Sequence, residues 1–214
     1  MDIYERMSST GVLPVIKIDN AKDAVPLAKA LKNGGLACAE VTFRTDAAEE
    51  SIKLIRKNFP EFFIAAGTVL TPEQADKAMA AGADMIVAPG FNPTVVKHCL
   101  AKGYPMVPGV CTPSEVEAAM ELGLRYLKFF PAENAGGVAF IKAICAPYRA
   151  VKFMPTGGLK PSNLGDYLRC KAVFCCGGSW MVPADKITNG NFDEIEALTK
   201  EAVALVAQIK AENK

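Results

Sequence analysis

The chain of 214 residues is long enough for one sizeable domain and short for two. Half of its residues are hydrophobic and 22% are charged, a composition that excludes a largely disordered protein. Its 24 Lys and Arg residues nearly balance its 23 Asp and Glu residues, and neither sign forms a run. The sequence therefore offers no broad charged surface for nucleic acid or for a membrane.

The cysteine and histidine content argues against disulfide and metal chemistry. The seven cysteines are odd in number and show no C-x-x-C spacing, which indicates reduced thiols. The only histidine, His98, falls in a predicted helix, so we expect no metal site and no cofactor. The first seven residues lack the apolar core of a secretory signal, and no apolar run approaches the length of a membrane span. We therefore expect a cytoplasmic protein.

Short apolar, β-branched runs alternate with helical patterns along the whole chain. The first strand is predicted at residues 13–18 and the first helix at 23–32, before two glycines. The later strands are predicted at residues 38–43, 63–69, 85–88, 106–110, 126–130, 152–155 and 172–176. The helices that follow them are predicted at residues 47–58, 72–82, 93–101, 113–123, 137–145, 162–168 and 192–210. Thr71 and Thr112 each precede a proline, which is typical of a helix N-cap.

Repeated β-α units predict parallel strands, arranged either as an open doubly wound sheet or as a closed barrel. The regular spacing of eight such units favours the barrel. We therefore predict an α/β fold, a single (β/α)8 TIM barrel that spans residues 1–214. Active sites of such barrels lie at the carboxyl ends of the strands.

A lysine stands in the middle of the predicted strand 126–130. Alternation along this strand directs Tyr126, Lys128 and Phe130 inward and Leu127 and Phe129 toward the helices. Burial of an ammonium group is costly unless the group is paired or loses its proton. Lys128 could extend to the surface or pair with a carboxylate, or it could be a desolvated amine that forms a Schiff base.

The predicted strand 38–43 also carries polar residues toward the barrel axis. Its alternation places Glu40, Thr42 and Arg44 on one face. A buried salt-bridge network of Glu40, Arg44 and Lys128 would explain these charges structurally. Such networks add little stability over apolar packing, so a functional site is the better interpretation.

Two glycine pairs follow the last two predicted strands, in Pro155-Thr156-Gly157-Gly158 and Gly177-Gly178-Ser179-Trp180. Glycines let backbone N–H groups approach an anion, and a helix that starts after Ser179 would add its positive end. The same two loops commonly bind phosphate in barrels. They therefore predict a phosphate site.

Several motifs together resemble the family of class I 2-keto-3-deoxy-6-phosphogluconate (KDPG) aldolases, many of which also cleave 2-keto-4-hydroxyglutarate (KHG). The resemblance covers nearly the whole chain, from the second to the eighth predicted strand. The motifs are Glu40-Val41-Thr42-Phe43-Arg44-Thr45, Ala66-Gly67-Thr68-Val69, Pro89-Gly90, Lys128-Phe129-Phe130-Pro131-Ala132-Glu133, Pro155-Thr156-Gly157-Gly158 and Gly177-Gly178-Ser179-Trp180.

The resemblance implies a role for each matching residue. Lys128 corresponds to the Schiff-base lysine and Glu40 to the general acid/base. The other matching positions are expected to bind substrate. They are Arg44, Thr68, Phe130 and Pro89 around the pyruvate end, and Thr156, Gly157, Gly158, Gly178 and Ser179 around the phosphate. The resemblance further implies a metal-free homotrimer that acts on a 2-oxo acid phosphate in Entner–Doudoroff-type catabolism.

Chemistry at Lys128 requires the neutral amine, and a tight pair with Glu40 would favour the ammonium form. We therefore expect Glu40 to be offset from the amine, partly protonated or bridged to it by water. Two rival functions keep the same pocket: a phosphosugar isomerase or epimerase without an imine, and a non-catalytic sugar-phosphate sensor.

Overall fold

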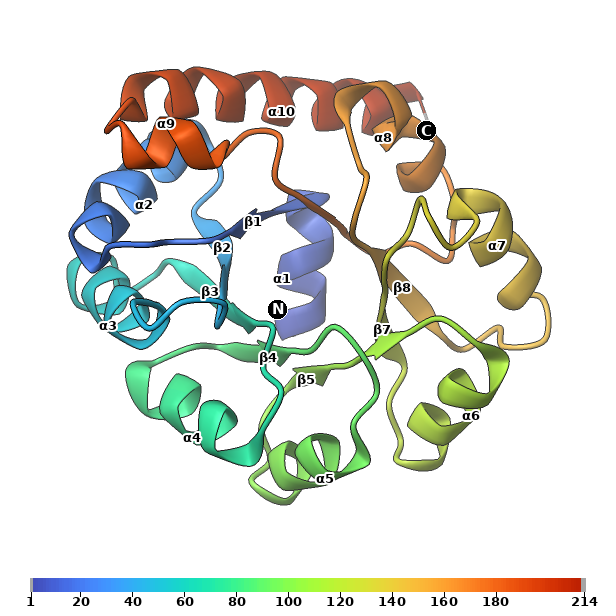
Figure 1. The fold of residues 1–214 in the computed structure, drawn as a ribbon. Helices are drawn as coiled ribbons and strands as arrows, with labels where there is room; N and C mark the ends of the chain where they lie inside the picture. The colour runs from blue at the N-terminus through green and yellow to red at the C-terminus, as the bar shows by residue number, and fades with distance from the viewer. Residues whose placement is uncertain (1, 213–214) are drawn as a thin grey trace.

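Residues 2–212 are described by a computed structural model, in which helices surround a set of parallel strands (Figure 1). Met1 and residues 213–214, which the predicted domain includes, lie outside the described residues. The strands are β1 (Val12–Ile16), β2 (Cys38–Thr42), β3 (Phe63–Gly67), β4 (Met85–Val87), β5 (Met106–Val107), β6 (Gly109–Val110), β7 (Tyr126–Phe129), β8 (Lys152–Pro155) and β9 (Cys176–Gly178).

The helices match most of the predicted ones. They are α1 (Ile3–Thr10), the 3₁₀ helix η1 (Ala21–Asp23), α2 (Ala24–Asn33), α3 (Ala48–Asn58), α4 (Pro72–Ala81), α5 (Pro93–Ala101), α6 (Pro113–Glu121), α7 (Gly137–Ile144), α8 (Pro161–Leu168), α9 (Ala184–Thr188) and α10 (Phe192–Glu212). Both predicted N-caps are confirmed, because the Thr71 and Thr112 side chains accept hydrogen bonds from the amides of Gln74 and Glu115.

The strands form two parallel sheets. One contains β5, β4, β3, β2, β1 and β9 in that order, and the other contains β6, β7 and β8. The α/β class and the parallel strands are thus confirmed. The prediction of one closed eight-stranded sheet is not reproduced, since no continuous ladder joins the two sheets in the described part of the chain.

Each seam between the sheets has a local cause. At one seam the predicted strand 106–110 divides at Pro108, which has no backbone N–H to donate to a ladder. Its first part pairs with β4 and its second part with β7. At the other seam only two isolated parallel bridges, Phe153 with Val173 and Thr156 with Gly177, connect β8 to the following segment.

The predicted strand 172–176 is also displaced along the chain. Its beginning hydrogen-bonds to β8, where the Phe153 amide donates to the Ala172 carbonyl. Its end changes partner, because the Cys176 amide donates to the Gly11 carbonyl before β1. The regular ladder with β1 therefore covers only residues 176–178.

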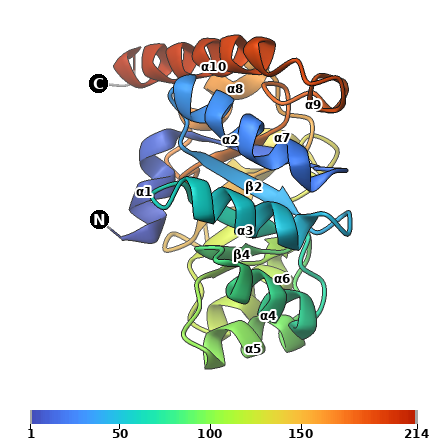
Figure 2. The same ribbon diagram turned by 90° about the vertical axis from the view of Figure 1, so that its left-hand side faces the viewer.

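Helix α1, which the sequence analysis did not predict, covers the end at which the strands begin. Figure 2 shows the arrowhead of β2 directed away from α1. The ring of Tyr4 stacks on Tyr126 with centroids 4.0 Å apart, and the Arg6 guanidinium lies 5.4 Å from the centre of the Phe63 ring. Both partners are the first residues of strands, so α1 closes the end opposite to the carboxyl ends.

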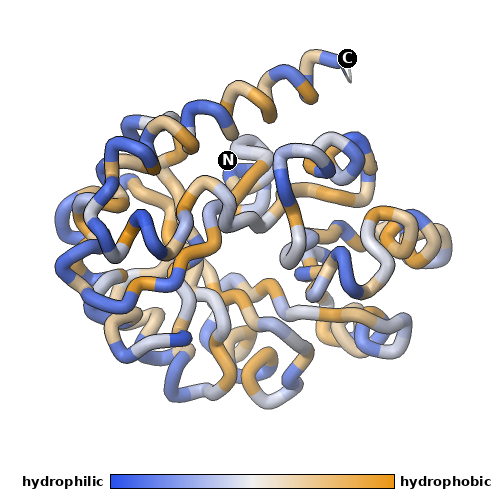
Figure 3. The backbone as a smooth tube through the Cα atoms, turned by 45° about the horizontal axis from the view of Figure 1, so that its top comes forward, coloured by the Kyte–Doolittle hydropathy of each residue, from blue (hydrophilic) through white to orange (hydrophobic). Residues whose placement is uncertain are grey.

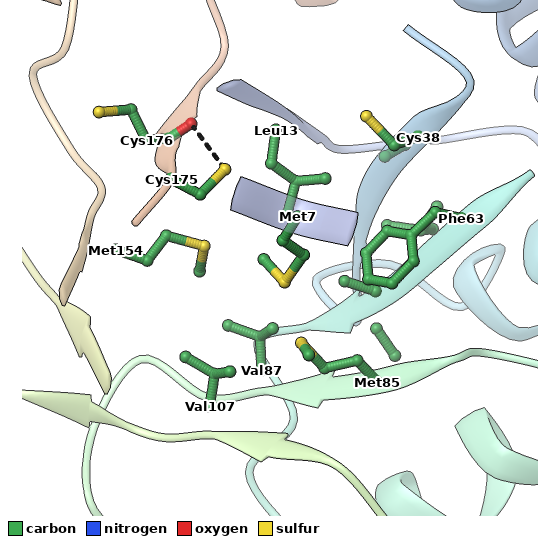
Figure 4. Close-up of a cluster of buried hydrophobic side chains, with 14 of the residues drawn as sticks. Met7, Leu13, Cys38, Phe63, Met85, Val87, Val107, Met154, Cys175 and Cys176 are labelled. Carbon is green, nitrogen blue, oxygen red and sulfur yellow. Dashed lines mark hydrogen bonds between the residues drawn. The ribbon is translucent and has the colours of Figure 1, made fainter. Parts of the chain in front are cut away.

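The core is apolar and rich in sulfur. Figure 3 shows hydrophobic segments along the strands and the inner sides of the helices. Figure 4 shows Met7 of α1 among the buried side chains of strands from both sheets, including Met85 and Met154. Cys38 and Cys175 belong to the same cluster and are fully enclosed. No helix in the described residues is long and apolar enough to cross a membrane.

The buried thiols should resist alkylation. Burial raises the pKa of Cys175 to about 12 and that of Cys99 to about 11, and it also raises those of Cys38 and Cys176. A thiol whose pKa is raised carries almost no reactive thiolate at pH 7. Only Cys111 and Cys145 are partly exposed.

We therefore expect maleimide to label Cys111 and Cys145 within minutes in the folded protein and the five buried cysteines only in denaturant. Peptide mapping by mass spectrometry measures the order of labelling. Early labelling of Cys38 or Cys175 would contradict the enclosed cluster.

Candidate active site

The central pair of the site consists of Glu40 on β2 and Lys128 on β7, which belong to different sheets. Lys128 Nζ donates a hydrogen bond to Glu40 Oε1 over 3.1 Å. Lys128 is 4% exposed and Glu40 is 0% exposed. The two sheets therefore curl toward each other, and the inward direction predicted for both side chains is confirmed.

The contact between the two groups is direct but one-sided. Glu40 Oε2 is buried and has no hydrogen-bond partner among the described residues. An offset or water-bridged arrangement, which the sequence analysis considered, is not what the structure has. The contact also differs from a bidentate ion pair, because one carboxylate oxygen is left for another partner.

Small residues on β3 make room for the Glu40 side chain. Glu40 is in register with Ala65, and Thr42 is in register with Gly67. A Cβ atom on Gly67 would lie 2.2 Å from Glu40 Oε1 and 2.5 Å from its Cγ, which no real contact allows. Gly67, quoted above only as part of a motif, therefore permits the carboxylate to reach Lys128.

Thr42 connects Arg44 to the neighbouring strand. The Thr42 hydroxyl donates to the Ile16 carbonyl over 2.7 Å and accepts a hydrogen bond from Arg44 Nε over 3.0 Å. Arg44 itself is exposed and forms no ion pair with Glu40. The three-charge network considered as a structural explanation is therefore not observed, and the Arg44 guanidinium remains available at the rim.

A cavity of about 170 Å³ lies near the central pair, although neither Lys128 nor Glu40 lines it. Arg44, Phe130, Thr156 and the glycine loops line it. Phe130 lies between the cavity and the central pair, since its side chain lines the cavity and its ring centre is 5.5 Å from Lys128 Nζ. A larger polar cavity of about 360 Å³, lined by Phe43 and Lys77 among others, lies on the other side of Arg44.

The two glycine loops meet at the same cavity, as predicted. Its lining includes Gly157 and Gly158 after β8 and Gly177, Gly178 and Ser179 at the end of β9. The buried Thr156 hydroxyl has no partner among the described residues and would be 2.3 Å from a Cβ on Gly177. No helix starts directly after Ser179, so the positive helix end considered in the sequence analysis is not at this position: the next helix begins at Ala184, because residues 179–182 form a turn.

Thr68 and Pro89 follow β3 and β4, at the carboxyl ends of neighbouring strands. Thr68 has φ = 57°, a left-handed conformation that is unfavourable for a β-branched residue. Such strain concentrates at functional sites, where the surrounding structure maintains it. Neither side chain hydrogen-bonds to Lys128 or Glu40 in the described residues, so the structure places them near the rim without testing their roles.

The described residues contain no group of His, Cys, Asp and Glu side chains that could hold a metal ion. His98 instead contacts the Asp76 carboxylate over 2.7 Å, between α5 and α4 on the outside. The residues gathered at the site are thus an amine, a carboxylate, a guanidinium and hydroxyl groups.

The substitution Gly67→Ala should separate Glu40 from Lys128. The added methyl group occupies the position of the carboxylate, so we expect the distance from Nζ to Oε1 to exceed hydrogen-bond range in a crystal structure of the variant. Gly165→Ala is the matched control, because its methyl group would meet only the flexible end of Arg169. An unchanged pair in Gly67→Ala would refute the steric argument.

Comparison with known proteins identifies the family. The family described as KDPG and KHG aldolase matches residues 3–198. A 2-dehydro-3-deoxy-phosphogluconate aldolase of Treponema pallidum is 48% identical over 204 residues, which are 95% of this chain and 97% of the relative. The KHG/KDPG aldolase of Escherichia coli K12 is 45% identical over 93% of this chain and 94% of its own.

Solved structures agree with this relationship. The KDPG aldolase of Legionella pneumophila, with pyruvate captured at low pH as a covalent carbinolamine intermediate, has a TM-score of 0.90 and 39% identity over 94% of this chain and 98% of its own. The match of family, sequence and fold extends over nearly the whole chain. This chain belongs to the KDPG and KHG aldolase family.

Proposed function

We propose that this protein is a class I aldolase that cleaves KDPG to pyruvate and glyceraldehyde 3-phosphate, and also 4-hydroxy-2-oxoglutarate to pyruvate and glyoxylate. The observation that carries the proposal is the buried contact of the Lys128 amine with one oxygen of Glu40, beside a cavity lined by two glycine loops. The comparisons support the same activity, since relatives at 45–48% identity carry these names.

Lys128 is the nucleophile of this mechanism. Its neutral amine adds to the C2 ketone to form a carbinolamine, and loss of water gives a protonated imine. The C3–C4 bond then breaks, and its electron pair moves into the imine to form an enamine. Protonation of the enamine at C3 and hydrolysis of the imine release pyruvate and restore the amine.

Glu40 moves the protons of this sequence. Its Oε1 contacts Lys128 Nζ, so it can take a proton from the ammonium and return it to the departing hydroxyl of the carbinolamine. The C4 hydroxyl must lose a proton as the C3–C4 bond breaks. The unpartnered Oε2 of Glu40 can accept that proton, directly or through a water molecule.

The remaining residues position the substrate. Arg44 and Thr68 bind the carboxylate next to the ketone, and Pro89 and Phe130 line the pyruvate end. The phosphate end is formed by Thr156, the amides of the two glycine loops and Ser179, with Gly157 and Gly158 in left-handed conformations that glycine adopts without strain. These roles rest on the family resemblance and on the placement of the residues around the cavity.

We further propose that the two sheets act as one interrupted (β/α)8 barrel within a single domain, because isolated bridges join β8 to the segment that leads into β9 and close contacts join β5 to β7. The proposed homotrimer rests on the family resemblance, and Leu70, which is 51% exposed beside the active-site rim, offers apolar surface for it. We also propose a cytoplasmic location, with which the free thiols are compatible, and a role in Entner–Doudoroff-type catabolism, which rests on the family resemblance.

Trapping with pyruvate and borohydride tests the mechanism. We expect a permanent adduct on Lys128, located by mass mapping, and no effect of a chelator on turnover. Lys128→Ala should abolish both trapping and cleavage, whereas Lys142→Ala, an exposed lysine on α7, should retain both.

The same variant separates the rival functions. An isomerase or epimerase would form no reducible adduct and would keep part of its rate in Lys128→Ala. A sensor would have no rate to lose. A partial rate in Lys128→Ala without an adduct, or the absence of any turnover in the unsubstituted protein, would refute the proposed aldolase activity.

Glu40→Gln should uncouple imine formation from cleavage. Loss of the general acid/base should lower kcat by about 10²–10⁴-fold, while slow trapping of pyruvate on Lys128 persists. Gly67→Ala should resemble Glu40→Gln in both measurements, because it displaces the same carboxylate. Full turnover of Glu40→Gln would exclude Glu40 as the group that moves the protons.

A further inference from the structure

A second acid, Glu133, lies behind the glycine loop that follows β8, and the proposed mechanism does not use it. The Tyr167 hydroxyl of α8 donates a hydrogen bond to Glu133 Oε1. Tyr167 is 1% exposed, although the Glu133 residue itself is on the surface. Burial and the neighbouring carboxylate both raise the pKa of Tyr167, so the phenol keeps its proton and remains the donor.

The backbone next to Glu133 holds the same loop directly. The Ala132 amide donates to the Thr156 carbonyl over 2.9 Å, and the Glu133 amide donates to the Gly157 carbonyl over 3.1 Å. A Cβ on Gly158 would lie 2.7 Å from both Cβ and Cγ of Glu133. The stem of Glu133 thus packs against Gly158, and the loop formed by Gly157 and Gly158 lines the cavity, which Glu133 itself does not line.

Helix α8 holds the loop from its other end. The Asn163 side-chain amide donates to the Gly158 carbonyl over 3.2 Å, and Asn163 Oδ1 accepts from the Lys160 amide over 2.8 Å. Tyr167 lies one turn further along the same helix. Glu133 and Tyr167 therefore connect the segment after β7, which carries the reactive lysine, to the helix that anchors the glycine loop.

We propose that Glu133 and Tyr167 form a positioning pair that fixes the Gly157–Gly158 loop and so determines how well the enzyme accepts phosphorylated substrates. This inference rests on the proposed function and adds a determinant of specificity to it. Neither residue touches the reacting atoms. Their effect reaches the substrate only through the loop, so it should depend on the presence of a phosphate group.

The two proposed substrates provide an internal comparison, because 4-hydroxy-2-oxoglutarate carries no phosphate. Tyr167→Phe removes one hydroxyl and keeps the ring in the core. We expect KM for KDPG to rise about fivefold to tenfold with kcat little changed, and both constants for 4-hydroxy-2-oxoglutarate to stay within about twofold. The inhibition constant of inorganic phosphate against KDPG should rise by the same factor as KM.

Variants at Glu133 distinguish positioning from folding. Glu133→Gln keeps an oxygen that accepts from Tyr167, so it should retain KM near the unsubstituted value, whereas Glu133→Ala should match Tyr167→Phe. The double variant Glu133→Ala/Tyr167→Phe should be no worse than either single variant, since the two residues act as one pair. Tyr148→Phe is the matched control, because Tyr148, in the turn after α7, donates to Glu117 of α6 over 2.7 Å.

Failure of the two proposals would look different. Absence of an imine with pyruvate in the unsubstituted protein would overturn the proposed aldolase and with it this inference. Imine formation with an equal loss on both substrates in Tyr167→Phe would leave the aldolase intact and reduce the pair to a stabilising contact. An unchanged KM for KDPG and an unchanged phosphate inhibition constant would equally overturn the positioning role.

Discussion

The buried contact between Glu40 and Lys128 constrains the rest of the structure. Two charged groups removed from water are tolerated only if they meet with good geometry. The residues stand on β2 and β7, in different sheets, so the pair can form only if the sheets curve around a common interior. The curvature of the sheets and the small residues of β3 together allow these two side chains to lie 3.1 Å apart.

The interior has two halves along its axis: an apolar half where the strands begin and a half with the candidate site where they end. Between the pair and the end at which the strands begin, α1 and the side chains of Met7, Met85 and Met154 fill the space and exclude water. Toward the carboxyl ends of the strands, β3 and β9 carry glycine and alanine in place of large side chains. Cavities therefore lie there instead of a packed core. The same strands therefore supply stability at their beginnings and binding surface at their ends, as the barrel class generally does.

Most of the fold and the central pair followed from the sequence, because period-two alternation fixes which side chains share a face. This argument placed Lys128 and Glu40 inside without any knowledge of their distance. It could not reveal the direct contact, since that depends on how far two sheets curl. It also could not reveal the clearance that Gly67 provides, because the clash of a Cβ with Glu40 arises between strands that are adjacent only in space.

The errors in the predicted elements have the same origin. Helix α1 buries only Met7 among its residues, and it packs through contacts such as Tyr4 on Tyr126 that are distant in sequence. The displacement of β9 arises where the chain exchanges β8 for β1 as its hydrogen-bond partner. Beyond that exchange the strand consists of Gly177 and Gly178, and glycine has a low strand propensity, so only the three-dimensional pairing with β1 fixes the boundary.

The charge balance of the pair is compatible with the role that the proposed mechanism gives to a buried carboxylate in imine chemistry. In the ionised form, the ammonium of Lys128 compensates Glu40. After transfer of one proton, both groups are neutral, and neither leaves an isolated charge in a dry interior. In the proposed mechanism, the protonated imine on Lys128 again places a cation beside Glu40. The buried pair thus stays electrically balanced at each stage. The free-energy cost of removing the two groups from water arises once, on folding, and does not recur during the reaction.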